Sequence, residues 1–503
     1  TYFPWLSSIA ISLHAGFWEE CLFRAVPIAG AVLLGKKFGK PKIWIIGAFL
    51  LQAVIFGAAH ANYAQQPAYA RLVELIIPAI GFGLLYFYFG LLPAIILHYA
   101  VDVVWIGMPL FVSTAPGIWV DRMLVIIFTF IPLFLVFWRR IRAPKLGDVK
   151  KEDYNRSWKP PKRIESKSVE SKIEKQPVLS VQKSRILLII GIVGLIIWFF
   201  TTSFHNYAPN FTVSRSKAEE IARKTLEDRG ITLSDTWQLL GRVQAPLGDD
   251  DRFIWQNEGE EKYEELSGHY IFPPRWQCRF VRFEGDVAER AEEYQIYITG
   301  KGEVLRVRHI LPEGRAGASL SETQARRLAH SLLQEKYQLD ASSLKEVSAE
   351  PTKLPKRKDW LFTFADEKNH PLDQGETRIA VDIAGDKVID SYRYIHVPEE
   401  WQRQERNRNS KLQIIQILVG ILIFLIFLAG VITGVVKWTR KKFSLSVFLI
   451  FFALLLIVGI INMFNQWPLM MAQFSTAEPL TNQIFTMVAL NVVGILFRSA
   501  ISA

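Results

Sequence analysis

The chain has 503 residues, of which 50% are hydrophobic and 21% are charged, and its formal net charge is +11. This balance argues against a purely soluble protein and against one made only of membrane spans, so we expect membrane helices plus a sizeable polar domain. The basic excess is concentrated in residues 139–185, which hold 15 Lys and Arg against 6 Asp and Glu. A basic excess confined to one segment indicates which side of the membrane that segment occupies, and no nucleic-acid partner is expected.

Apolar runs of roughly the 20 residues that a bilayer core requires recur along the chain and predict nine membrane spans. They lie near residues 4–34, 43–61, 72–90, 92–112, 119–138, 185–204, 412–437, 444–464 and 481–500. The first run is long and contains Pro27, so we expect a kink or an interfacial turn there. The predicted fold is therefore mainly α: a polytopic helical bundle with a core at residues 1–138 and three C-terminal spans at 412–503.

Three basic loops fall on the same side of the membrane when the nine spans alternate. They are residues 35–42, 139–184 and 437–442. The positive-inside rule makes this side cytoplasmic, so 139–184 is interpreted as a basic cytoplasmic linker and 205–411 as extracytoplasmic. We expect a multi-pass protein of a bacterial plasma membrane, in contact with lipid.

The region 205–411 contains an internal repeat of a helix followed by a small antiparallel sheet. The two helical segments begin at 216 and 321, and the two closing hairpins cover 297–308 and 379–389. The arrangement resembles tandem PepSY-type modules, a family associated with regulatory domains near proteases, although a plain α+β domain explains the sequence equally well. Six histidines without ligand spacing are interpreted as surface or core residues: His205, His269, His309, His330, His370 and His396.

Charged side chains interrupt the first apolar run at Glu19, Glu20 and Arg24. Charges at membrane depth are expensive and by default indicate a functional site. Glu20 and Arg24 are four residues apart on one helical face and can pair, whereas Glu19 points about 100° away. Glu19 is therefore the carboxylate that is left unpaired and available for a functional role. The alternative is a buried ion pair that only holds helices together.

Two further spans carry histidines. The second span ends in Phe56 and His60, with the small residues 57–59 between them, and small residues let neighbouring helices approach closely. The fourth span holds His98 and Asp102, spaced so that the carboxylate can accept from one imidazole nitrogen and orient the other. Two histidines and one glutamate also match the ligands of catalytic zinc sites that keep a position for water. The HExxH motif of zincins is absent.

Three motifs thus stand in order, each in its own span: Glu19-Glu20-x-x-x-Arg24, Phe56-x-x-x-His60 and His98-x-x-x-Asp102. Together they resemble the CPBP family of type II CAAX prenyl endopeptidases and bacteriocin-processing or bacteriocin-immunity enzymes, over roughly residues 5–112. The resemblance implies an intramembrane endopeptidase with its site in a polar cavity between helices, acting on peptide or membrane-protein substrates. A prenylated substrate is not expected from the bacterial-looking topology.

The resemblance also implies a role for each motif residue. Glu19 and His60 would activate the attacking water, and His98 and Asp102 would complete the site. The supporting residues would be Glu20, Arg24 and Phe56. Family members carry Asn or Asp at the position of Asp102, and only Asn or a protonated Asp can donate a hydrogen bond to an oxyanion. Two mechanisms stay open: zinc held by Glu19, His60 and His98, or a metal-free Glu/His peptidase.

Two other classes of protein fit part of the sequence. A non-catalytic membrane sensor or scaffold would use its outer domain to bind a ligand and its buried charges to hold the helices together. A transporter also places polar residues on several spans, but no inverted repeat is apparent among the spans.

Overall fold

The computed structural model describes residues 1–61, 69–142, 180–201, 211–245 and 248–503. Two compact units make up the chain: Thr1–Gly147 together with Asn210–Ala503, and Asp148–Pro209. Most of the predicted linker 139–184, and also His205, lie outside the described residues.

The N-terminal part of the first unit is helical. Its elements are α1 (Pro4–Glu20), η1 (Cys21–Ala25), α2 (Val26–Phe38), α3 (Pro41–Ala59), α4 (Ala70–Glu74), α5 (Ile76–Phe89), α6 (Leu91–Val112) and α7 (Ile118–Arg142). Apolar residues dominate these helices, and many large apolar side chains are exposed at their surfaces, as expected where lipid replaces water as the solvent. The second unit contributes α8 (Val181–Thr201).

The first predicted span is one continuous path of helix with a wide turn in its middle. Residues Cys21–Ala25 form a π-helical turn, η1, between α1 and α2. Pro27 lies in the first turn of α2, directly after η1. Because proline lacks an N–H and its ring crowds the preceding turn, the wider turn accommodates it without ending the helix. The structure thus places a π turn, which carries Arg24, directly before Pro27, where the sequence predicted a kink or an interfacial turn.

Seven helical segments of the described residues are long and apolar enough to cross a membrane. They are Pro41–Ala59, Ala70–Phe89, Leu91–Val112, Ile118–Arg139, Glu399–Thr439, Leu445–Asn465 and Leu480–Ser502. The predicted spans 4–34 and 185–204 are not among them: the first is divided by η1, and the apolar part of α8 is the shorter Arg185–Thr201. Within the described residues, seven of the nine predicted spans thus correspond to helices of this length and composition, and the count of nine stays a prediction.

The C-terminal helices are α14 (Glu399–Thr439), α15 (Leu445–Asn465), the short α16 (Trp467–Met471) and α17 (Leu480–Ser502). Helix α14 runs unbroken for 41 residues across the predicted boundary at 411. At 1.5 Å per residue this helix is about 60 Å long, roughly twice the thickness of a bilayer core. The helix is therefore longer than a bilayer core requires, and its polar first third continues beyond the apolar part that could span the membrane.

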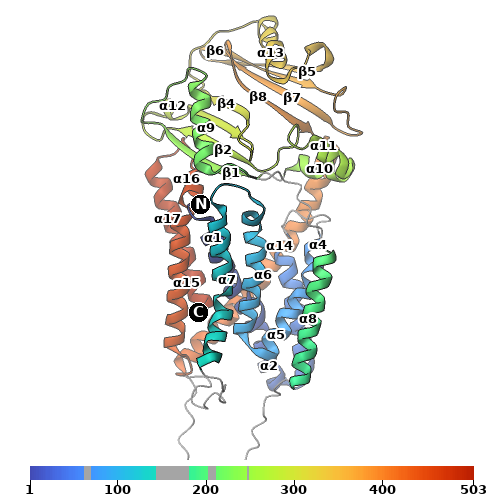
Figure 1. The fold of residues 1–503 in the computed structure, drawn as a ribbon, viewed down its shortest axis with the longest axis vertical. Helices are drawn as coiled ribbons and strands as arrows, with labels where there is room; N and C mark the ends of the chain where they lie inside the picture. The colour runs from blue at the N-terminus through green and yellow to red at the C-terminus, as the bar shows by residue number, and fades with distance from the viewer. Residues whose placement is uncertain (62–68, 143–179, 202–210, 246–247) are drawn as a thin grey trace, which may run out of the picture. The chain divides into compact units, whose positions relative to one another are not determined.

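Between α8 and α14 the chain forms two four-stranded antiparallel sheets, with strand orders β1-β2-β3-β4 and β5-β6-β7-β8 (Figure 1). The strands are β1 (Gln238–Gln244), β2 (Arg275–Val281), β3 (Glu293–Ile298), β4 (Val304–Ile310), β5 (Lys345–Leu354), β6 (Arg357–Ala365), β7 (Glu376–Ala384) and β8 (Lys387–His396). The helices are α9 (Arg215–Glu227), α10 (Asp249–Asn257), α11 (Gly259–Leu266), α12 (Val287–Arg290) and α13 (Glu322–Tyr337), with a short 3₁₀ turn, Ala341–Ser343.

The predicted pattern of a helix followed by a sheet occurs twice. Helix α9 covers the first sheet through Ala218, Ala222 and Leu226. Helix α13 covers the second sheet through Ala325, Ala329 and Leu333. In both helices three apolar residues recur every four positions, which places them on one face against the strands. Cys278 lies in the first of these cores and is fully buried.

Candidate active site

The motif residues come from three helices that approach closely. Glu19 and Glu20 are the last residues of α1, His60 directly follows α3, and His98 and Asp102 lie on α6. Gly16 brings α1 against α6, because a Cβ there would stand 3.1 Å from the backbone oxygen of Ile95. One turn later on α1, the carboxylates therefore face the histidine of α6.

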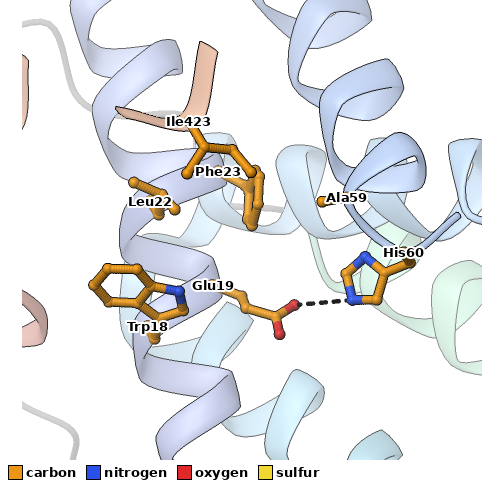
Figure 2. A pocket seen from close by; sticks show the side chains of 7 residues that line it. All are labelled: Trp18, Glu19, Leu22, Phe23, Ala59, His60 and Ile423. Carbon is orange, nitrogen blue, oxygen red and sulfur yellow. Dashed lines mark ion pairs between the residues drawn. The ribbon is translucent and has the colours of Figure 1, made fainter. Parts of the chain in front are cut away.

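The structure brings Glu19, His60, His98 and Asp102 together. Glu19 Oε2 lies 3.7 Å from His60 Nε2 and 3.6 Å from His98 Nε2. Asp102 Oδ2 lies 3.6 Å from the same nitrogen of His98. Figure 2 shows Glu19 and His60 pointing toward one another across a pocket. Glu19 and Asp102, separated by 83 positions, thus meet at one imidazole nitrogen, His98 Nε2.

Glu20, and not Asp102, makes the close contact that orients His98. His98 Nδ1 lies 2.7 Å from Glu20 Oε1, and both side chains are buried. Since a carboxylate oxygen accepts, Nδ1 carries the proton and donates it. The sequence assigned this orienting contact to Asp102, but Asp102 is on the Nε2 side at a longer distance. The helical spacing of four allowed a contact without deciding which nitrogen it would reach.

His60 is oriented by its own helix. Its Nδ1 lies 2.7 Å from the backbone oxygen of Phe56, the carbonyl one turn earlier. A carbonyl can only accept, so Nδ1 carries the proton, and in the neutral ring Nε2 presents a lone pair toward Glu19. Because α3 ends at Ala59, the carbonyl of Phe56 is one of the last of the helix and is available to a side chain.

Arg24 is completely buried beside Glu20. Its Nε lies 3.4 Å from Glu20 Oε2, and both side chains have 0% exposure. None of the three guanidinium nitrogens has a hydrogen-bond partner among the described residues. The guanidinium instead lies over the ring of Phe56, with 4.2 Å between its central carbon and the ring centroid. The expected Glu20–Arg24 pair is thus a charge contact supported by a cation–π contact.

Phe56 has three neighbours in the site. Besides holding Arg24 over its face, its ring lies 4.7 Å from the ring of His60 and 6.2 Å from that of His98, measured between centroids. This explains why an aromatic residue stands four positions before the histidine.

Two residues at the site were not found from the sequence. Phe82 on α5 stacks on His98 with 5.0 Å between ring centroids and 19° between the ring planes. Ile423 on α14 lines the pocket that contains Glu19 and His60. Both are ordinary apolar residues in apolar helices, so only the packing of helices distant in sequence identifies them.

The pocket beside the motif residues has a volume of about 370 Å³. It is lined by Trp18, Glu19, Leu22, Phe23, Ala59, His60 and Ile423 (Figure 2). Glu19 and His60 are the ionisable groups of this lining, and the other five side chains are mainly apolar. The volume is within the range of pockets that bind small ligands or peptide side chains.

No group of three or more His, Cys, Asp or Glu side chains within the described parts of the chain is arranged to hold a metal ion. The zinc site with Glu19, His60 and His98 therefore stays a prediction from the sequence.

A comparison with protein families gives one match that covers this site. The family of type II CAAX prenyl endopeptidases, Rce1-like, matches residues 1–104, about a fifth of the chain. No curated protein and no solved structure matches the chain. The match includes every motif residue, and it implies a protease acting on peptide or protein substrates. Together with the seven apolar helices, it supports an integral, multi-pass membrane protein.

Proposed function

We propose that the protein is an intramembrane endopeptidase in which Glu19 and His60 activate the attacking water. The observation that carries the proposal is the convergence of three acceptor atoms: Glu19 Oε2 lies 3.7 and 3.6 Å from the Nε2 atoms of His60 and His98. With Nδ1 protonated and both rings neutral, each Nε2 presents a lone pair. Acceptors that face one another need a donor between them, and water can donate to two of them at once.

The reaction begins with water bound between Glu19 and His60. Glu19 takes a proton from the water as the water oxygen bonds to the peptide carbonyl carbon, and the C=O π electrons move to the carbonyl oxygen. In the second step the oxygen electrons return to re-form C=O, the C–N bond breaks, and the departing nitrogen takes the proton from Glu19. The products are a carboxylic acid and an amine, and Glu19 is a carboxylate again.

The remaining motif residues position these groups. Glu20 holds His98 through Nδ1, so that the opposite nitrogen faces Glu19. Arg24 compensates the charge of Glu20, and both side chains are completely buried. Asp102 lies beside His98 Nε2 and, in its protonated form, can donate a hydrogen bond to the oxyanion.

We further infer that the two sheets are regulatory or substrate-recruiting modules of the PepSY type on the extracytoplasmic side of a bacterial plasma membrane. Each module is a helix covering a four-stranded sheet, as the resemblance implies. The motif residues all precede the sheets in the chain, so the proposed chemistry is contained in the helical part.

The proposal is tested with purified protein in lipid vesicles and a pooled library of apolar synthetic peptides, with cleavage products identified by mass spectrometry. The wild type is expected to cleave, and His60→Gln to lose cleavage. His396→Gln is the matched control, because it makes the same change in strand β8 of the second sheet. If the wild type cleaves no peptide, or if His60→Gln cleaves as fast as His396→Gln, the endopeptidase function is wrong and the protein is better described as a sensor or scaffold.

A further inference from the structure

The lining of the catalytic pocket comes from two distant parts of the chain. Six of the seven lining residues lie between Trp18 and His60, within the part that matches the endopeptidase family. The seventh, Ile423, lies on α14, more than 300 residues beyond the end of that match. Figure 2 shows Ile423 beside Phe23, bordering the same pocket as Glu19 and His60. A residue outside the catalytic segment therefore borders the space that a substrate would enter.

Helix α14 contacts the pocket through one stripe of side chains. Val419, Ile423, Ile426 and Phe427 all pack on the apolar cluster that contains Leu22, Phe23 and Phe56. Their spacing of three and four residues places them on one face of the helix. The neighbouring Ile421, about 200° away from Ile423, is 52% exposed. Only one face of α14 therefore borders the site, and the opposite face is exposed.

The N-terminal end of α14 packs against the second sheet. Trp401 packs against the core of that sheet and meets the ring of Phe253 with 5.5 Å between centroids. Glu405, one turn further on, is buried and paired with Arg408 at 2.6 Å and Arg252 at 3.9 Å. Ile423 follows Glu405 by 18 residues of unbroken helix, which is about 27 Å. A continuous helix fixed at this end keeps Ile423 at a defined depth next to the pocket.

We propose that Ile423 is a specificity-determining residue whose side chain limits the size of the substrate side chain that can reach Glu19 and His60. This inference rests on the proposed endopeptidase function and adds the residue that selects among its substrates. The occupant is an apolar side chain beside the scissile bond, because Trp18, Leu22, Phe23 and Ile423 form most of the lining. A charged side chain in such a lining would lose its hydration without a partner.

The test compares cleavage-site preferences in lipid vesicles containing Ile423→Ala, Ile423→Phe or the wild-type protein. The probe is a pool of apolar peptides that differ only in one central residue, Ala, Leu or Phe, and mass spectrometry gives relative kcat/KM for each. Ile421→Ala and Ile421→Phe are the matched controls, because they make identical changes on the lipid-facing side of the same helix. Ile423→Val removes a single methyl group and provides a variant that keeps the fold if the larger changes do not.

Ile423→Ala is expected to raise the Phe-to-Ala preference about tenfold or more, since one methylene group in an apolar pocket is worth roughly 10- to 200-fold in selectivity. Ile423→Phe should lower that preference, and Ile423→Val should raise it by less than Ile423→Ala does. An unchanged preference in active Ile423 variants, or an equal shift in the Ile421 controls, would overturn the inference while leaving the endopeptidase function intact. Cleavage that persists in Glu19→Gln, or a wild type that cleaves none of the peptides, would overturn the proposed function and the inference with it.

Discussion

The buried pair of Glu20 and Arg24 gives the sharpest prediction about stability. Replacing Glu20 with Gln keeps a carbonyl oxygen that can accept the hydrogen bond from His98 Nδ1, so the histidine stays oriented. The same change removes the charge that lies 3.4 Å from Arg24 Nε. Arg24 is then left as a fully buried cation whose nitrogens have no hydrogen-bond partner among the described residues.

Removing one partner of a buried ion pair typically costs about 3–5 kcal/mol, because the other charge is left uncompensated. The value for Glu20→Gln should lie toward the lower end, since the ring of Phe56 at 4.2 Å still stabilises the guanidinium. Replacing Arg24 with Met in the same protein removes the stranded charge and keeps an unbranched side chain. The double variant Glu20→Gln/Arg24→Met should therefore recover most of the loss.

The assay is the free energy of unfolding in detergent micelles for the two single variants, the double variant and the wild type. The four values form a double-mutant cycle, in which we expect the loss of the double variant to be well below the sum of the two single losses. Glu19→Gln is the control for an acidic residue next to Glu20, and it should unfold like the wild type. Strictly additive losses, with the double variant less stable than either single variant, would refute the argument that the pair compensates a buried charge.

Three further predictions concern the site and the topology. Asp102→Asn should keep cleavage, because the amide has the same shape and can donate a hydrogen bond to the oxyanion, whereas Asp102→Leu should lose most of the activity. Equal kcat/KM values for the two variants would contradict the role of Asp102 as a hydrogen-bond donor. The variant Lys301→Cys, in the exposed β3–β4 turn, should react with a membrane-impermeant maleimide in intact cells, while the buried native Cys278 should not. Labelling of Lys301→Cys only after the membrane is opened would place the sheets on the cytoplasmic side. A zinc chelator should leave cleavage unchanged, and loss of activity restored by added Zn²⁺ would show that the zinc mechanism applies.

The sequence predicts the motif residues because charges within apolar runs stand out. Glu19, Glu20 and Arg24 interrupt a long hydrocarbon-like stretch, and His60 and His98 do the same in two others. Glu19 lies in the middle of its apolar run and His60 at the end of its own, yet their side chains and that of His98 meet within 3.7 Å. Depth depends on where each helix begins, on its tilt and on turns such as η1, and none of these follows from hydrophobicity alone.

The sequence does not show which atom each group contacts. Asp102 lies four residues from His98 and reaches its Nε2 side, while Glu20 from another helix occupies Nδ1. The contribution of α14 was hidden for a different reason. Ile423 is one apolar residue in a long apolar run, and the continuous helix that carries it from the second sheet crosses the boundary that composition places at 411. Contacts between distant helices depend on packing, which a local pattern does not encode.

The central claim is that the Glu19 carboxylate activates the water that cleaves the peptide. It is tested most directly by the kcat of Glu19→Gln on an apolar peptide in lipid vesicles, with thermal stability matched to the wild type. Gln has the same shape but cannot take the proton, so kcat should fall by about 100-fold or more, as expected for loss of a general base. A folded Glu19→Gln protein that retains the wild-type kcat would contradict the account.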